Sequence, residues 1–315
     1  MAEAILNQPH FQDADKAREY LEAIRWPNGP VCPHCSSMEG HYQLQGKAHR
    51  SGLWKCKDCR EQFTVTVGTV FERSKISLNV WLQAVYLICS SKKGISSKQL
   101  ERMLGVTYKT AWFMSHRIRE ALIGNPTGLL GGNGTSVEVD ETYWGNKGKQ
   151  AKGARGYAHK MKVISLVERD GQKRSFHVAN VTQKTVGPIL REQISTKARL
   201  MTDETSVYDK IGKEFASHDK VTHSAGEYSR GDITTNSVES SFAILKRGLY
   251  GTFHSVSEQH LQRYATEFDF RWNHRQSLGV DDIQRTDAAL KGISGKRLLY
   301  RRFELPPEFR LPRVT

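Results

Sequence analysis

Four cysteines constrain the first part of this 315-residue chain more than any other feature. They form two C-x-x-C pairs, "CPHC" at 32–35 and "CKDC" at 56–59. Two intervening residues let both thiolates of a pair turn toward one point, and two such pairs complete a tetrahedral shell of four sulfurs. Disulfides are the alternative, but no feature of the chain indicates an oxidising compartment. We therefore expect a structural Zn²⁺ bound by Cys32, Cys35, Cys56 and Cys59.

The residues around these pairs predict a zinc ribbon. Strand-like runs, "HYQLQ" and "GLWKC", lie between the pairs, and "QFTVTVGTVF" follows them. A module of this size depends on its metal to fold. Four cysteines fill the metal shell, which leaves no place for the nearby histidines His34, His41 and His49. The fifth cysteine, Cys89, lies on the apolar face of the next predicted helix, where we expect it to pack.

Helical periodicity follows the ribbon. Residues 77–91 carry apolar side chains at helical spacing. The next stretch predicts a helix over Ser97–Leu104, a turn at Gly105 and a second helix from about Thr107. A small core is expected from Leu100, Leu104, Val106 and Trp112. If this is a helix-turn-helix, its DNA contacts come from Thr107, Tyr108, Lys109, His116 and Arg117.

The charge balance favours a polyanionic partner. The chain has 47 Lys and Arg against 33 Asp and Glu, a formal net charge of +14. Such an excess is typical of nucleic-acid binding, although solvated charges on a basic protein and a three-helix protein-binding module are the alternatives. Residues 145–162 contain six Lys or Arg and no acid, and we expect Lys147 and Lys149 to contact DNA.

The second half alternates predicted strands and helices after a Gly-rich break at 125–136. The pattern predicts a strand ending in Asp140, a hairpin turning at Asp170-Gly171, a helix over "TVGPILREQI" and a strand ending in Asp203. A helix within 234–251 follows. Its apolar stripe is Val238, Phe242, Leu245 and Leu249, and a polar row beside it contains Asn236, Glu239 and Lys246.

Three acids on separate elements, Asp140, Asp203 and Glu239, can meet at the edge of a mixed sheet. There they would hold two hard divalent cations. The residues alone leave other interpretations open, since Asn236 and Glu239 have the spacing of a capping box and acids often end strands. We expect the neighbouring Glu138, Glu141 and Glu204 to point to opposite faces and take no part. A loop could bring His223 and Glu227 near the site.

As a whole, the chain resembles insertion-sequence transposases of the acidic-triad (DDE) class, in the group with an N-terminal zinc ribbon and an ISXO-like catalytic domain. The resemblance spans about residues 18 to 275 in family order. It rests on "YLEAIRWPNGPVCPHC", "LWKCKDCREQFTVTVGTVFE", "LGVTYKTAWFMSHRIREAL", "VEVDETYWG", "TTNSVESSFAILKRGLYGTFHSVS" and "HLQRYATEFDFRWNHR".

The resemblance implies a multidomain α+β protein with a zinc ribbon, a helix-turn-helix and a ribonuclease H-like mixed-sheet catalytic domain. Asp140, Asp203 and Glu239 match the triad that binds two Mg²⁺ (Mn²⁺ is possible), with Asn236 as an alternative third residue. Lys246 matches a basic residue that contacts the DNA end, beside Arg247. The implied partners are the terminal inverted repeats, target DNA and further copies of the chain, in a homodimer or larger assembly.

Two other functions fit the same residues. One is a DNA-binding regulator with a non-catalytic second domain, and the other is a stand-alone metal-dependent nuclease. A protein that binds DNA without cutting it would be the regulator. A protein that cuts DNA without joining 3′ ends would be the nuclease.

The expected domain boundaries follow these motifs. Residues 1–72 hold an N-terminal helix and the ribbon, 73–124 the helix-turn-helix, 133–278 the catalytic domain and 279–315 a basic C-terminal arm. The N-terminus has no signal-peptide pattern, and the apolar run at 80–89 is too short to span a membrane. We therefore expect a cytoplasmic, nucleoid-associated bacterial protein.

Overall fold

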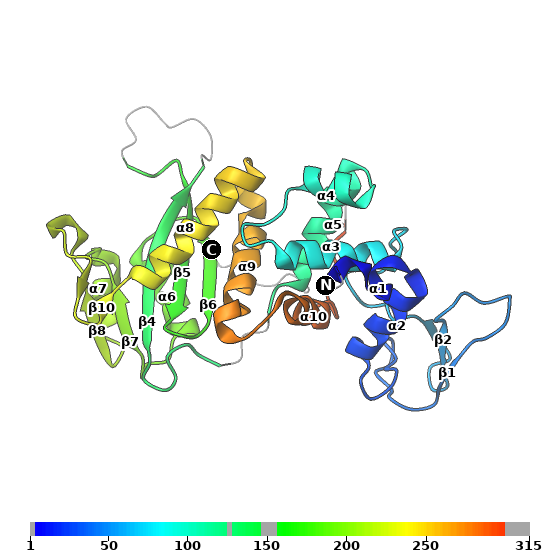
Figure 1. Cartoon of the computed structure of the whole chain (residues 1–315). Coiled ribbons are helices and arrows are strands. Elements are labelled where there is room, and N and C mark those ends of the chain that lie inside the picture. The colour runs from blue at the N-terminus through cyan, green and yellow to red at the C-terminus, as the bar shows by residue number, and fades with distance from the viewer. Residues whose placement is uncertain (1–3, 125–127, 146–155, 300–315) are drawn as a thin grey trace. The chain divides into compact units, whose positions relative to one another are not determined.

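The structure is a computed structural model that describes residues 4–124, 128–145 and 156–299. These residues form two compact units (Figure 1). One contains residues 4–124 and 276–299, and the other contains residues 128–145 and 156–275. The expected ribbon and helix-turn-helix domains, 1–72 and 73–124, thus share one unit.

The first unit begins with short helices and the ribbon. Helices η1 (Ile5–Asn7), α1 (Pro9–Gln12) and α2 (Ala14–Arg25) precede an antiparallel sheet of β1 (His41–Gln43), β2 (Trp54–Cys56) and β3 (Gln62–Phe63). Trp26 packs edge-on against Trp54 and Phe63, at ring-centroid distances of 6.4 and 5.8 Å. These aromatic contacts give the small sheet an apolar side. The strands lie where the runs around the cysteines predict them.

Helices α3 (Leu78–Ser90), α4 (Ser97–Leu104) and α5 (Tyr108–Ala121) follow. Gly105 ends α4 with a left-handed φ of 65°, and the Thr107 hydroxyl caps α5 by accepting from the Thr110 amide. Both features confirm the predicted turn and helix start. Of the expected core residues, Leu100 is buried, whereas Leu104, Val106 and Trp112 are half-buried.

A late segment completes this unit. Helix α10 (Asp282–Lys291) follows the short η5 (Gln276–Leu278), and it packs against α2 and α3 with Ala289 and Leu290 buried. Its N-terminus has a capping box between Asp281 and Gln284. The first part of the expected arm at 279–315 is therefore a packed helix, because its apolar residues recur at helical spacing. Residues 300–315 lie outside the described part.

A five-stranded mixed sheet organises the second unit. Its order is β6 (Lys173–Val178), β5 (Met161–Glu168), β4 (Ser136–Trp144), β7 (Arg199–Thr202) and β8 (Ser217–Lys220). β4 and β6 pair antiparallel with β5, while β4, β7 and β8 are parallel. The predicted hairpin joins β5 to β6, with Asp170 in the left-handed region at φ 55°. β4 does not end at Asp140 as expected but continues to Trp144, because the strand-favouring Thr142, Tyr143 and Trp144 keep pairing with β5.

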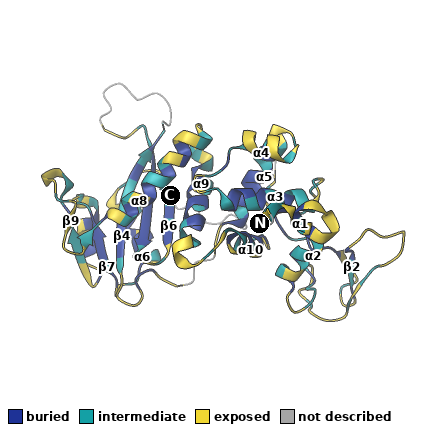
Figure 2. Ribbon diagram, in the orientation of Figure 1, coloured by how far each residue is buried: buried dark blue, intermediate teal, exposed yellow. Residues whose placement is uncertain are grey.

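Helices cover both faces of this sheet (Figures 1 and 2). Val137 and Val139 of β4 pack in a cluster with α6 (Gln183–Gln193) and α7 (Asp209–Gly212). On the other face, Trp144 packs with α8 (Asn236–Gly248) and α9 (Glu258–Asn273). The even-numbered residues of β4 therefore face α8, and Asp140 is among them. The predicted apolar stripe of α8 is buried in this second cluster.

Short elements complete the second unit. They are η2 (Ser206–Tyr208), η3 (His223–Ala225), the paired strands β9 (Ser229–Arg230) and β10 (Ile233–Thr234), and a π-helical turn, η4 (Leu249–Phe253). The strand pair β9–β10 leads directly into α8.

Candidate active site

The four cysteines of the ribbon form one cluster. Cys32 Sγ lies 3.6 Å from Cys59 Sγ, Cys35 Sγ lies 3.7 Å from Cys56 Sγ, and all four sulfurs are within 4.8 Å of one another. Zn–S bonds of about 2.3 Å in a tetrahedron separate sulfurs by about 3.8 Å, whereas a disulfide needs about 2.05 Å. The sulfurs are therefore spaced for Zn²⁺. Cys89 is buried in α3, as expected for packing.

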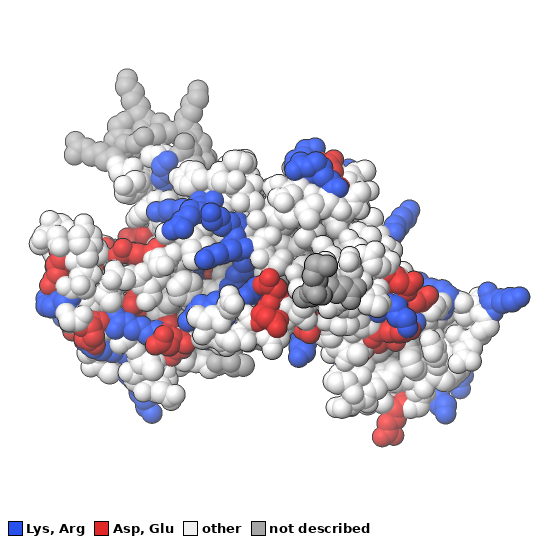
Figure 3. Space-filling view, viewed as in Figure 1, with Lys and Arg blue, Asp and Glu red and all other residues white. Residues whose placement is uncertain are grey.

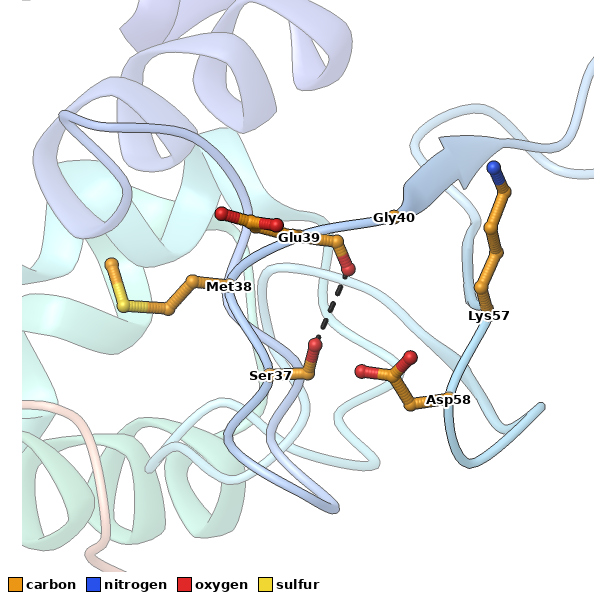
Figure 4. Close-up of a pocket in the computed structure, with 6 residues that line it drawn as sticks. All are labelled: Ser37, Met38, Glu39, Gly40, Lys57 and Asp58. Atoms are coloured by element: carbon orange, nitrogen blue, oxygen red, sulfur yellow. Dashed lines mark hydrogen bonds between the residues drawn. The ribbon is translucent and has the colours of Figure 1, made fainter.

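A hollow of about 530 Å³ lies beside the cysteine pairs (Figure 4). Its lining consists of Ser37, Met38, Glu39, Gly40, Lys57 and Asp58. In Figure 4 the Lys57 amine and the Glu39 carboxylate point to different sides. Because its charged groups do not converge, we assign this hollow no chemical role.

Strand register brings Asp140 and Asp203 together. β4 and β7 run parallel, with Ser136 opposite Arg199 and Glu138 opposite Met201. The same offset, continued two residues past the paired stretch, aligns Asp140 with Asp203. Asp140 on the central strand and Asp203, directly after β7, are distant in sequence but follow neighbouring parallel positions.

A buried carboxylate on β4 brings Glu239 to the same place. Glu138 Oε2 accepts hydrogen bonds from the backbone amides of Ser237 (2.8 Å) and Val238 (3.1 Å) in the first turn of α8. Glu138 and Asp140 are two residues apart, so their side chains leave β4 on the same face. The next residue after Val238 is Glu239, which therefore lies in the first turn of α8, where its charge acts on Asp140.

The electrostatics of Asp140 reflect this convergence. Its pKa is raised to about 8, first by burial, then by the Glu141 charge, and further by the charges of Asp203 and Glu239. A buried carboxylate surrounded by other negative charges in this way forms a site that a cation stabilises. Such clusters with strongly shifted pKa values are typical of functional sites.

Threonines hold the other two acids. The Thr205 amide and hydroxyl donate to the two oxygens of Asp203, at 3.0 and 2.7 Å. The Thr235 hydroxyl donates to Glu239 Oε1 at 2.7 Å, and His223 Nε2 lies 3.2 Å from the same oxygen. The sequence does not predict a role for either threonine, because a hydroxyl two or four residues from an acid is a common pattern with no distinct signal.

Asn236 differs from Glu239 in its setting. Thr235 is the N-cap of α8, Asn236 is its exposed first residue, and no side-chain cap hydrogen bond is present. The capping-box interpretation is therefore wrong. Glu239 instead accepts a hydrogen bond from the Thr235 hydroxyl, and its charge contributes to the raised pKa of Asp140.

Neighbouring acids have distinct roles. The expectation that Glu138 points away from Asp140 is wrong, since residues two apart on a strand share a face. Glu141 lies on the opposite face, where it accepts from the Tyr208 hydroxyl at 2.6 Å, and burial raises its pKa.

Glu204 accepts from the His223 and Ser224 amides, at 2.9 and 3.1 Å, and thus fixes the loop that carries His223. Glu227 accepts from the Thr222 amide in the same loop, at 3.2 Å.

The predicted DNA contacts divide by exposure. Thr107, Tyr108 and Lys109 are exposed at the start of α5. His116 is fully buried, and Arg117 is 6% exposed and donates to the Glu72 carbonyl oxygen at 2.8 Å. The expectation that these two residues face DNA is therefore wrong.

The remaining predicted contacts lie on the second unit. Lys147 and Lys149 lie outside the described residues. Near the end of α8, Arg247 is exposed and Lys246 is half-buried. Figure 3 shows basic side chains gathered over α8 and α9.

Comparison with known proteins agrees with this organisation. Residues 12–62 match the family described as transposase zinc-ribbon domain, and residues 129–273 match the ISXO2-like transposase domain. A protein from Halobacterium salinarum (strain ATCC 700922 / JCM 11081 / NRC-1), described as an uncharacterized protein in transposable element ISH50, is 29% identical over 281 residues. That alignment covers 83% of this chain and 91% of the relative.

Within the described residues, no helix is long and apolar enough to cross a membrane. The motifs, the cysteine cluster and both domain matches agree with one another. The chain is similar to insertion-sequence transposases that combine a transposase zinc ribbon with an ISXO2-like transposase domain.

Proposed function

We propose that the chain catalyses DNA transposition with Asp140, Asp203 and Glu239 as its catalytic acids. The observation that supports this proposal is that the acids lie on β4, directly after β7 and in the first turn of α8, and that the charges of Asp203 and Glu239 raise the pKa of Asp140. We further propose that the second unit is a ribonuclease H-like domain. The sheet order, with β4 and β7 side by side at its centre and helices on both faces, supports this.

The donor set suits hard divalent cations. Carboxylate oxygens are the ligands that Mg²⁺ and Mn²⁺ prefer, and the mutual repulsion around Asp140 is relieved by positive charge. Two such ions, when bound, would lower the pKa of the attacking hydroxyl and offset charge on the leaving oxygen. Glu239 serves better than Asn236 as the third ligand, because a carboxylate neutralises metal charge and Thr235 fixes its orientation.

The proposed reaction has two in-line displacements at phosphorus. In the first, a water oxygen attacks the phosphodiester at the element end, and the bond to the 3′ oxygen breaks to leave a 3′-OH. In the second, that 3′ oxygen attacks a target phosphodiester, and the target strand's own 3′ oxygen leaves. No covalent bond to the protein forms.

Recognition of the DNA ends must come from elsewhere, because the three acids carry no sequence preference. We propose that α4 and α5 form a helix-turn-helix whose exposed Thr107, Tyr108 and Lys109 contact the terminal repeats, together with the ribbon. Lys246 and Arg247 would contact the DNA end near the acids. Because two ends are joined to one target, the active form would be a homodimer or larger.

An Asp140→Asn variant tests this function. In a strand-transfer assay with Mg²⁺, it should bind the terminal repeats as the wild type does and lose both cutting and joining. Wild-type rates in the variant would show that Asp140 is wrongly assigned. If the wild-type protein binds without cutting, the regulator alternative holds, and if it cuts without joining, the nuclease alternative holds.

A further inference from the structure

Glu138 is a buried carboxylate that the proposed chemistry does not use. It is 0% exposed, in the middle of the sheet, and two residues before Asp140. Burying a carboxylate costs several kcal/mol unless hydrogen bonds and an opposite charge compensate. Glu138 has both the hydrogen bonds and an opposite charge, that of Arg169. This indicates that the buried carboxylate has a specific structural role.

Glu138 first acts as a hydrogen-bond acceptor for the N-terminus of α8. Thr235, the N-cap residue, makes no side-chain cap hydrogen bond, because its hydroxyl donates to Glu239. The amides of Ser237 and Val238 would then lack the usual acceptor, and Glu138 Oε2 supplies it from β4. A negative charge at a helix N-terminus is also favoured by the helix dipole. The cap of α8 therefore comes from the strand that carries Asp140.

Arg169 extends this connection. Its Nε donates to Glu138 Oε1 at 3.0 Å, and its Nη2 donates to the Thr234 carbonyl oxygen at 3.3 Å and contacts Met201 Sδ at 3.1 Å. Thr234 precedes α8, and Met201 lies on β7 two residues before Asp203. The Glu138–Arg169 pair thus touches every element that carries one of the three acids.

We propose that Glu138, supported by Arg169, is a positioning residue that sets the spacing of Asp140 and Glu239 for metal binding. This inference rests on the proposed function of those acids. It does not make Glu138 a ligand, since both of its oxygens are occupied by donors from α8 and Arg169. Loss of these bonds would let the first turn of α8 move relative to β4, and the cation site would loosen.

The test is a titration of the full chain with Mn²⁺ alone, in which free Mn²⁺ is measured by its electron paramagnetic resonance signal. Glu138→Gln should raise the Mn²⁺ dissociation constant at least about tenfold, the effect typical of groups that orient metal ligands. Arg169→Met should act in the same direction, and it carries the test if Glu138→Gln does not fold. In strand transfer, both variants should need more Mg²⁺ for half-maximal rate while terminal-repeat binding is unchanged.

Glu168→Gln is the matched control. Glu168 ends β5, and its Oε1 accepts from the Gly131 amide (2.9 Å) and the Thr135 hydroxyl (2.7 Å), so its loss perturbs the same sheet away from α8. It should leave the Mn²⁺ dissociation constant unchanged.

Unaltered Mn²⁺ binding in both Glu138→Gln and Arg169→Met would overturn the positioning role. Failure of the proposed function itself would look different, because Asp140→Asn would then bind Mn²⁺ as the wild type does.

Discussion

The ion pair between Lys173 and Asp269 gives a quantitative test of how the five-stranded sheet is held to α9. Lys173 Nζ lies 3.3 Å from Asp269 Oδ1, and the two residues are only 2% and 9% exposed. The Ser175 amide and hydroxyl also donate to Asp269, both at 2.6 Å. Burial lowers the pKa of Lys173 and raises the pKa of Asp269, so each charge depends on the other.

Lys173→Met removes one charge and leaves Asp269 with the Ser175 donors alone. Breaking one side of a buried pair costs about 3–5 kcal/mol, a large part of the roughly 5–15 kcal/mol by which a domain is stable. The assay is native-state hydrogen exchange read by mass spectrometry on peptides from β6 and α9. A loss of about 3 kcal/mol should accelerate exchange there by about 100-fold.

The double variant Lys173→Met with Asp269→Asn is the control. It buries no unpaired charge, and the asparagine can still accept from Ser175, so much of the protection should return. Exchange in Lys173→Met that stays within about fivefold of the wild type, under about 1 kcal/mol, would refute the reasoning.

Three further predictions concern the two proposed metal sites and the proposed DNA contacts. Cys56→Ser should release zinc, measured by atomic absorption, and unfold the ribbon; a folded, zinc-free ribbon would contradict the assignment. Glu239→Gln should slow strand transfer more than about 100-fold and Asn236→Ala far less, and the reverse order would make the amide the third catalytic residue. Lys109→Ala should weaken terminal-repeat binding and reduce by about 1 the slope of the logarithm of the binding constant against the logarithm of salt concentration. Arg117→Ala should instead lower the melting temperature of the protein. A reduced salt dependence of binding in Arg117→Ala would show that Arg117 contacts DNA.

Local patterns predicted much of the fold. The cysteine spacing predicted the sulfur cluster. Gly105 predicted the end of α4, because glycine readily adopts the left-handed backbone conformation that often ends a helix. The apolar stripe of α8 was identified because helical periodicity depends on sequence neighbours alone.

Features set by distant partners could not be predicted. Glu138 caps α8 through amides 99 and 100 residues away, and no local signal marks such a contact. The position of Arg117 on α5 suggested a contact with DNA. Its guanidinium instead donates to the backbone carbonyl oxygen of Glu72, 45 residues earlier in the chain. The convergence of Asp140 and Asp203 depends on the parallel register of β4 and β7, which the sequence suggests only through the order of its elements.

The central claim is that Asp140, Asp203 and Glu239 bind the catalytic cations together. Crystals of the full chain with a terminal-repeat duplex and Mn²⁺ would test it by anomalous scattering at the manganese edge. We expect anomalous peaks in contact with all three carboxylates, and their loss in Asp140→Asn crystals. Well-ordered carboxylates with no peak between them, in crystals that bind Mn²⁺ elsewhere on the chain, would contradict the account.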